Sequence, residues 1–330
     1  MVGLQDCLDT LTEVIVSQQD EGGKHEPTPS EYFALILVTL SARVEEDKLP
    51  FFLQILVGVI PNTSASLLQS QYRAFAKVIL HILSLTNSPT ARYYALECIG
   101  EILLAQDTSD GFWNQVQALQ AINALLGGID DENTKIRKVA MTSLTDLLIL
   151  HHTKHYSTIR TYLAEFAQGI MKATTRAHYR RSLCLLVFLE PVLVYLPQDW
   201  VKKLTTSSMR LQTIEIPKVT AAIYRLYDAL FQHPAYAFSI PITQSLLTTL
   251  LTHAPLLGDV EANCYYCCAL SSAFSLLIKL DNLTAYSVLP SVVGGLGRYM
   301  ETEFEQVHIA SCMSLKRIFQ LLLISVTPLF

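Results

Sequence analysis

Charged side chains are scarce in this sequence: only 16% of its 330 residues are Asp, Glu, Lys or Arg, whereas 51% are hydrophobic. This composition excludes an intrinsically disordered chain, which combines high charge with low hydrophobicity. The two longest stretches without a charged residue, 229–258 and 49–72, are interrupted by prolines. Neither therefore provides the roughly 20 unbroken apolar residues of a membrane-spanning helix. We expect no membrane association, and we attribute the mean hydropathy of +0.32 to helices that are buried on several sides.

The sequence also lacks the features of a secreted protein. Asp6 and Asp9 stand where a signal peptide has its basic region. The seven cysteines are odd in number and scattered along the chain, as is typical of reduced thiols. We therefore expect a cytosolic or nuclear location.

No motif of catalysis or metal binding is complete. Cys264 and Cys267 form a Cys-x-x-Cys pair and Cys268 follows, but the chain has no second pair to complete a zinc site. At helical spacing these cysteines suit a buried face. His151 and His155 are four residues apart, without a carboxylate at helical spacing beside them. The sequence contains neither a nucleophile elbow nor a phosphate-binding loop. We predict a protein that is not an enzyme and that has no cofactor or metal.

Signals for β-strands are missing too. No segment alternates strictly between apolar and polar residues, and no Asn-Gly or Asp-Gly turn separates two strand-like segments. Apolar residues instead recur at helical spacing, as in the stripe within 4–15. One helix start can be identified at residues 28–31. Thr28 is expected to be the cap, Pro29 occupies the first helical position, and the Glu31 side chain is expected to bond back to the capping residue. The sequence predicts an all-α fold.

The helical pattern repeats along the chain. Segments 88–104 and 133–149 superimpose with a shift of 45 residues, which places Arg92 on Arg137. Two helices per forty-odd residues are typical of HEAT and armadillo repeats, which stack because one helix pair cannot bury its apolar face alone. Weaker copies of the 133–149 helix follow at spacings in the low to middle forties, at 176–193, 216–231, 259–277 and 304–319. We therefore expect a single α-solenoid over 1–330. The expected parts are a helix over 1–20, a loop over 21–30 and about seven HEAT-like helix pairs over 31–330.

One repeat can be predicted in more detail. Residues 112–126 and 133–150 are expected to form an antiparallel helix pair, with Gly127 and Gly128 in the turn between them. Trp113 is expected to be at least partly buried as a wedge between repeats.

A cluster of charge surrounds the start of the second helix of this pair. Asp130 or Asp131 is expected to cap that helix, because acids suit the start of a helix. Arg137 is expected to pair with the same turn or a neighbouring turn. Lys135 and Lys138 need no such structural role, so they either contact a polyanion or form a solvated face.

The charge of the chain is also unevenly distributed. Residues 135–225 contain 14 Lys and Arg against 5 Asp and Glu, a net charge of +9, whereas 1–134 carry −11 and 226–330 carry −3. Because equivalent turns of a solenoid line up along one edge, these cations are candidates for a ribbon facing RNA phosphates or an acidic protein tail. The alternative is a solvated edge that keeps an apolar protein soluble. The candidate contact residues are Lys135, Lys138, Lys154, Arg160, Lys172, Arg176, Arg180, Arg181, Lys202 and Lys203.

One stretch, 100–148, has a more specific pattern. A Leu-Leu…Gln-Asp order is followed by Trp113, an apolar helix and then Asp…Lys-x-Arg-Lys-x-Ala. This order resembles the ribosomal RNA-processing protein twelve family, a nucleolar HEAT-repeat family of eukaryotic ribosome biogenesis. The resemblance extends over about 35–232, and its further support lies in 49–83, 187–200 and 218–231.

The resemblance implies the N-terminal part of a non-catalytic assembly factor of the small-subunit pre-ribosome. It implies pre-ribosomal RNA, assembly factors or ribosomal proteins, and nuclear transport factors as partners. The implied location is the nucleolus and nucleus, with shuttling to the cytoplasm. Importin-like proteins share the Asp…Arg pattern, so an importin-like or other HEAT-repeat adaptor that binds proteins for transport is the alternative.

Overall fold

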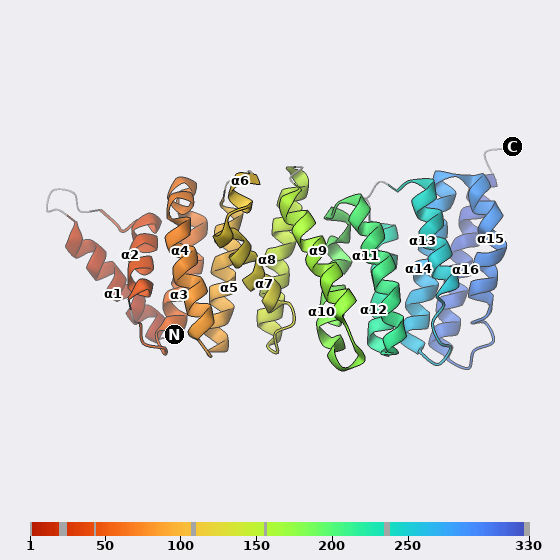
Figure 1. Cartoon of the computed structure of the whole chain (residues 1–330), viewed down its shortest axis with the longest axis horizontal. Coiled ribbons are helices and arrows are strands. Elements are labelled where there is room, and N and C mark those ends of the chain that lie inside the picture. Colours follow the sequence, from red (N-terminus) through yellow and green to blue (C-terminus); the bar gives the residue numbers. More distant parts are fainter. Residues whose placement is uncertain are drawn as a thin grey trace. The chain divides into compact units, whose positions relative to one another are not determined.

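The computed structural model describes residues 2–19, 25–42, 44–106, 110–154, 157–233 and 238–326. These residues form α-helices and short 3-10 helices, and no strand occurs among them (Figure 1). The prediction of an all-α fold is therefore confirmed. The chain divides into two compact units, Met1–Ile159 and Arg160–Phe330, which we call unit 1 and unit 2. A single solenoid over the whole chain remains a prediction.

Unit 1 consists of two layers of helices. The first helices of successive pairs, α2, α4 and α7, pack against one another, and the second helices, α3, α5 and α8, form a parallel row. This stacking buries the apolar face that each helix pair exposes by itself. The helices of unit 1 are α1 (Val2–Gln18), α2 (Pro29–Ser41), α3 (Leu49–Val59), α4 (Ala65–Leu85), α5 (Pro89–Leu104), α6 (Asp110–Trp113), α7 (Val116–Gly128) and α8 (Thr134–Thr153).

Unit 2 is built in the same way. Its second helices, α10, α12, α14 and α16, pack in a row, and its first helices include the neighbouring α13 and α15. The repeat pattern of the sequence predicts the helices of this row. The helices of unit 2 are α9 (Thr158–Ala173), α10 (Tyr179–Val192), α11 (Gln198–Arg210), α12 (Pro217–Gln232), α13 (Ile240–Thr252), α14 (Val260–Leu280), α15 (Asn282–Gly297) and α16 (Glu305–Val326).

The start of α2 confirms a local prediction. The Thr28 hydroxyl accepts a hydrogen bond from the Glu31 N–H at 3.4 Å, and the Thr28 N–H donates to the Glu31 carboxylate at 2.7 Å. With Pro29 in the first turn, this is a complete capping box. The hydrogen bonds from Thr28 to the Glu31 carboxylate lower its pKa.

The pair α7 and α8 confirms the predicted helix over 133–150 but divides the one predicted over 112–126, because α6 ends at Trp113 and α7 begins at Val116. It also corrects the role of the glycines. Gly127 and Gly128 are the last residues of α7, and the turn follows them. Gly128 is buried, and a Cβ atom there would lie 2.8 Å from the Cβ of Ala140 and 3.1 Å from Cδ1 of Leu96. This glycine therefore lets α7 approach α8 and α5 closely. The prediction that both glycines form the turn is wrong.

Trp113 is fully buried, as predicted. Its ring packs edge-to-face against the Phe112 ring, with the centroids 4.9 Å apart, and against the His151 ring at 4.6 Å. The tryptophan thus joins α6 to the end of α8. The burial of such a large aromatic ring makes this contact a major part of the core of unit 1.

One helix has a property that the uncharged stretches of the sequence do not indicate. Among the described residues, Glu305–Ile324 of α16 is long and apolar enough to cross a membrane, judged by length and composition alone. Lys316 and Arg317 interrupt this segment, so it does not stand out as a long uncharged stretch. One such helix is weak evidence for a membrane span, because the core helix of a soluble protein can have the same length and composition.

Candidate functional site

The turn between α7 and α8 is held together by Arg137. Its Nη1 donates to the carbonyl oxygens of Asp131 at 2.7 Å and Glu132 at 3.0 Å, and its Nη2 donates to Thr134 Oγ1 at 3.0 Å. The guanidinium is suited to this role because its donors have a fixed fork geometry. Arg137 therefore binds its own turn, as the sequence predicts, but through main-chain carbonyls.

The cap of α8 differs from the prediction. Asn133 is the N-cap residue, and its side-chain oxygen accepts from the Lys135 N–H at 2.9 Å. Neither Asp130 nor Asp131 caps the helix, so that prediction is wrong. The reason is that Asp131 lies two residues before the cap, where its Oδ1 accepts from the Asn133 N–H at 2.8 Å and so shapes the turn.

The second oxygen of Asp131 connects two repeats. Arg92, near the start of α5, places Nη2 2.6 Å from Asp131 Oδ2. The Asp131 side chain is only 7% exposed, whereas Arg92 is 40% exposed. Arg92 is equivalent to Arg137 in the 45-residue repeat. The two equivalent arginines therefore share this turn: one binds its carboxylate and the other binds its backbone.

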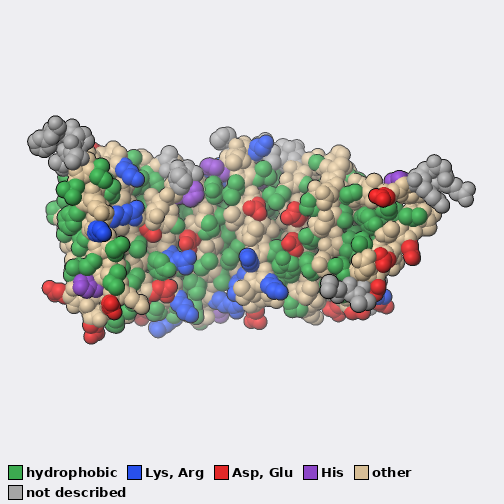
Figure 2. Space-filling model, turned by 180° about the vertical axis from the view of Figure 1, so that it is seen from behind, with side chains coloured by type: hydrophobic (Ala, Val, Ile, Leu, Met, Phe, Trp, Pro, Cys, Tyr) green, Lys and Arg blue, Asp and Glu red, His purple; other side chains and the backbone are tan. Residues whose placement is uncertain are grey.

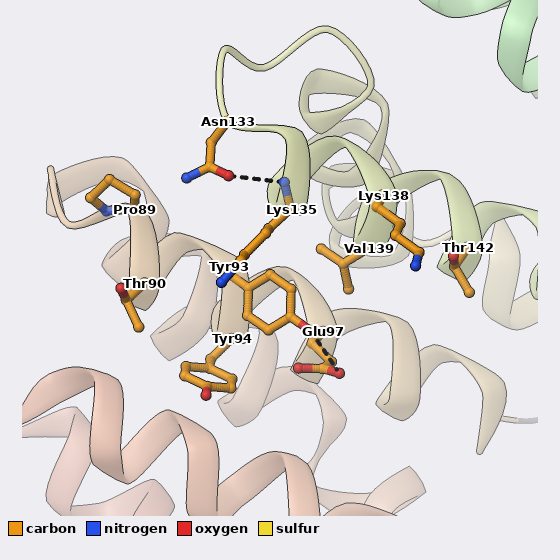
Figure 3. Close-up of a pocket in the computed structure, with 10 residues that line it drawn as sticks. All are labelled: Pro89, Thr90, Tyr93, Tyr94, Glu97, Asn133, Lys135, Lys138, Val139 and Thr142. Carbon is orange, nitrogen blue, oxygen red and sulfur yellow. Dashed lines mark hydrogen bonds between the residues drawn. The ribbon is translucent and has the colours of Figure 1, made fainter.

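Lys135 and Lys138 lie beside a groove between α5 and α8 (Figure 3). Both side chains are exposed, and among the described residues neither has a carboxylate within ion-pair distance. The groove has a volume of about 690 Å³. Its wall from α5 includes Tyr93, Tyr94 and Glu97, and the Lys135 side chain extends toward the tyrosine pair in Figure 3.

The tyrosines form an edge-to-face pair. The centroids of the Tyr93 and Tyr94 rings are 5.1 Å apart, with an angle of 79° between the ring planes. The Tyr93 hydroxyl donates to Glu97 Oε1 at 3.5 Å. Partial burial raises the pKa of the Glu97 carboxyl, and the hydrogen bond from Tyr93 opposes that shift. The groove thus combines two aromatic rings, one carboxylate and two cations.

The sequence does not identify the two tyrosines as site residues, although the 45-residue repeat relates their positions to those of the α8 residues in the groove. A shift of 45 residues places Thr90 on Lys135, Tyr93 on Lys138, Tyr94 on Val139 and Glu97 on Thr142. All eight of these residues line the groove. The groove is therefore formed by equivalent positions of two successive second helices.

The topology divides the ten candidate cations into two groups. Consecutive helices run antiparallel, so within a unit the turns from first to second helices lie at one end of the helices and the returning turns at the other (Figure 1). Lys135 lies in the first turn of α8 and Lys154 at its C-terminal cap, about 28 Å apart along the axis at 1.5 Å per residue. Similarly, Arg160 lies near the start of α9 and Lys172 near its end. The expectation that all ten cations share one edge is therefore wrong.

The turn between α9 and α10 contains the largest group of candidate cations in unit 2, and we call it the α9–α10 basic turn. Lys172 Nζ donates to Gln168 Oε1 at 3.0 Å. Arg176 Nη1 lies 3.7 Å from Glu215 Oε2, and the side chains of Arg176 and Glu215 are each 70% exposed. Figure 2 shows several Lys and Arg side chains along the lower margin of the face that it draws. The cations of this turn are Lys172, Arg176, Arg180 and Arg181.

The other cations lie at the opposite ends of the helices. Arg160 is half-buried, its Nε donates to the carbonyl oxygen of Tyr195, and burial lowers its pKa. It therefore stabilises the fold of unit 2. Lys202 is exposed, and Lys203 Nζ lies 4.4 Å from the centroid of the Trp200 ring.

The histidines and cysteines that the structure describes do not form a metal site. Among the described residues, no group of three or more His, Cys, Asp or Glu is placed to hold a metal ion. Cys267 is buried, which raises the pKa of its thiol to about 12, while Cys264 and Cys268 are half-buried. His151 is buried in the core beside Trp113, and His155 lies outside the described residues.

Comparison with known proteins places these features in a family. Residues 12–237 match the family described as "RRP12-like, N-terminal HEAT repeats". The human "RRP12-like protein" is 25% identical over 328 residues, a match that covers 94% of this chain and 24% of the human protein. This chain thus spans about a quarter of the length of that relative.

The crystal structure of a karyopherin shows the same fold. The karyopherin Kap121p, in a crystal structure "bound to the extreme C-terminus of the protein phosphatase Cdc14p", matches with a TM-score of 0.65 and 13% identity, over 92% of this chain and 31% of the karyopherin. A designed armadillo repeat protein matches over 87% of this chain and 99% of its own, but its TM-score of 0.31 is too low to support an argument. The family match extends over more than half of the chain, and the chain therefore belongs to the RRP12-like family, as a region of N-terminal HEAT repeats.

Proposed function

We propose that this chain is a non-catalytic scaffold in the biogenesis of the small ribosomal subunit. In this proposal it contacts pre-ribosomal RNA through cations at the turns that lead from first to second helices. Two groups contribute: Lys135 with Lys138 in unit 1, and the α9–α10 basic turn in unit 2. Membership of the RRP12-like family supports the role in ribosome biogenesis.

The observation that carries the RNA contact is the placement of Lys135 and Lys138. Both are exposed in the first two turns of α8, where the positive end of the helix dipole disfavours cations. They are also three residues apart, a spacing at which like charges on a helix repel each other. Helix stability therefore does not account for these lysines, whereas a polyanionic ligand such as RNA relieves both unfavourable interactions.

The proposed protein partners are small-subunit assembly factors or ribosomal proteins, and nuclear transport factors. The proposed location is the nucleolus and nucleus, with shuttling to the cytoplasm. Both proposals rest on the family. The karyopherin Kap121p shares the fold, and at 13% identity it supports the fold alone.

The test is affinity purification of the tagged chain from cells, followed by sequencing of the bound RNA at two salt concentrations. We expect enrichment of small-subunit precursor RNA and reduced enrichment for the double variant Lys135→Ala with Lys138→Ala. The matched control is Lys202→Ala with Lys203→Ala, which removes the same charge from α11, a first helix of unit 2.

Two results would contradict the proposal. One is the recovery of no small-subunit precursor RNA above background. The other is a set of protein partners that persists unchanged after RNase treatment without any bound RNA, which would favour the transport adaptor instead.

A further inference from the structure

We infer that the groove between α5 and α8 binds an unpaired segment of RNA, with a base placed against the tyrosine pair and the adjoining phosphates near the two lysines. This inference rests on the proposed RNA-binding function and specifies the kind of RNA that the site recognises. It concerns unit 1 only.

The groove has the size and lining of such a site. Its volume of about 690 Å³ lies in the range of pockets that bind small organic ligands, about 300–1,000 Å³, and a nucleotide is a ligand of this size. Tyr93 and Tyr94 are half-buried, so their rings are held in place by α5 while remaining open to the groove. Their edge-to-face arrangement also leaves ring faces that are not covered by the partner ring.

The combination of rings and cations distinguishes between the forms of RNA. In a duplex the base faces are stacked on one another, and a protein meets mainly phosphates and 2′-hydroxyls. Lysines alone are enough for that contact. Aromatic rings add affinity only when a base is unstacked and can lie on them, which is the mode of binding single strands. The tyrosines beside Lys135 and Lys138 therefore favour an unpaired segment.

The position of Glu97 indicates how the RNA segment is oriented in the groove. Its carboxylate lies in the groove next to Tyr93 and accepts the hydrogen bond from that hydroxyl. A carboxylate repels phosphate but accepts hydrogen bonds from base amino groups and from ribose 2′-hydroxyls. The phosphates are therefore expected on the α8 side of the groove, beside Lys135 and Lys138, and the base and ribose on the α5 side, near the tyrosines and Glu97.

The decisive experiment measures fluorescence anisotropy of the purified full chain with a labelled 12-nucleotide unstructured RNA and with a 12-base-pair RNA duplex of the same sequence. The variant is Tyr94→Leu, which keeps apolar bulk but removes the ring, and the matched variant is Tyr94→Phe, which keeps the ring. Tyr286→Leu removes an exposed tyrosine of unit 2 and serves as the control. Thermal melting of each variant checks that it is folded.

We expect Tyr94→Leu to weaken binding of the single strand by about 5- to 150-fold, the range produced by removing one base–aromatic stacking interaction. Duplex binding should change by less than about twofold, and Tyr94→Phe and Tyr286→Leu should bind the single strand like the parent chain. Equal binding of both RNAs with no effect of Tyr94→Leu would overturn the inference and leave the proposed function intact. Failure of the parent chain to bind either RNA at low salt would overturn both.

An acidic peptide is the competing ligand for the lysines. A 12-residue glutamate-rich peptide is therefore added as a competitor to the single-stranded RNA. We expect it to displace the RNA only at a large excess. If it binds more tightly than the RNA and loses that affinity in Tyr94→Leu, the groove is a peptide site and the inference is wrong.

Discussion

Arg137→Ala should destabilise the protein while leaving most of its RNA binding intact. The substitution removes three hydrogen bonds from a charged donor, two of them to main-chain carbonyls of the α7–α8 turn. A hydrogen bond to a charged group contributes about 1.5–3 kcal/mol when it is buried. Arg137 is half-buried, so water replaces part of each bond, and we expect a total loss of about 2 kcal/mol. For a unit of this size each kcal/mol lowers the Tm by about 2–4 °C, which gives a decrease of about 4–8 °C.

The assay pairs thermal melting, followed by circular dichroism at 222 nm, with RNA binding at several salt concentrations. Arg137→Lys is the informative control, because it keeps the charge but a single ammonium cannot bond both carbonyls and Thr134 in the same geometry. It should lose more than half of the stabilisation. The double variant Lys135→Ala with Lys138→Ala should melt within about 1 °C of the parent, because exposed charges contribute little. Its log–log salt slope should decrease by about 0.7 for each phosphate of single-stranded RNA that the lysines no longer neutralise.

Two results would refute these separate roles for the arginine and the lysines. If Arg137→Ala melts with the parent chain, the hydrogen bonds to the turn contribute nothing to stability. If it changes the salt slope as much as the double lysine variant does, Arg137 belongs to the RNA contact.

Three further predictions concern the core. Trp113→Ala should lower the free energy of unfolding by about 3–5 kcal/mol, because it empties a fully buried site; a loss below 1 kcal/mol by urea denaturation would contradict the assigned burial. Gly128→Ala should destabilise by about 1–3 kcal/mol through overpacking, whereas Gly127→Ala, whose Cβ would meet nothing within 4 Å, should be neutral or stabilise by up to about 1 kcal/mol; equal effects of the two would refute the close approach of the helices. Finally, burial raises the pKa of Cys267 and of Tyr266 to about 12 each, above their ordinary values of 9.0 and 10.0. The folded chain then keeps protons that the unfolded chain releases, so stability should fall as pH rises from about 9 toward 12; a urea midpoint that is unchanged between pH 8 and pH 10.5 would contradict this.

The sequence alone is sufficient for the properties that depend on near neighbours in the chain. Helix periodicity and the capping box of Thr28 and Glu31 involve residues within one or two turns of each other, so they can be read directly. The 45-residue repeat identifies the equivalence of Arg92 and Arg137, and the burial of Trp113 follows from its large apolar ring. The family resemblance is carried by the order of residues in 100–148, which is also a property of the sequence, and the family match confirms it.

The side chains that meet across repeats cannot be read in this way, because those contacts join residues some forty positions apart. The sequence predicts Asp130 or Asp131 as the cap of α8, but Arg92 from the preceding repeat binds the Asp131 carboxylate, and Asn133 caps the helix instead. The sequence likewise places Gly128 in a turn, although its role is the close approach of α7 to Ala140 of α8.

The candidate site shows the same division. Its lysines can be found from the sequence because exposed charge at a helix start is a local feature, whereas the tyrosines of α5 belong to the site only because α5 packs beside α8. Lys135 and Lys154 stand at the two ends of α8, so they are separated by the length of that helix. A charge count along the chain contains no such information, because it records how many cations a region has and not the end of the helix at which each one lies.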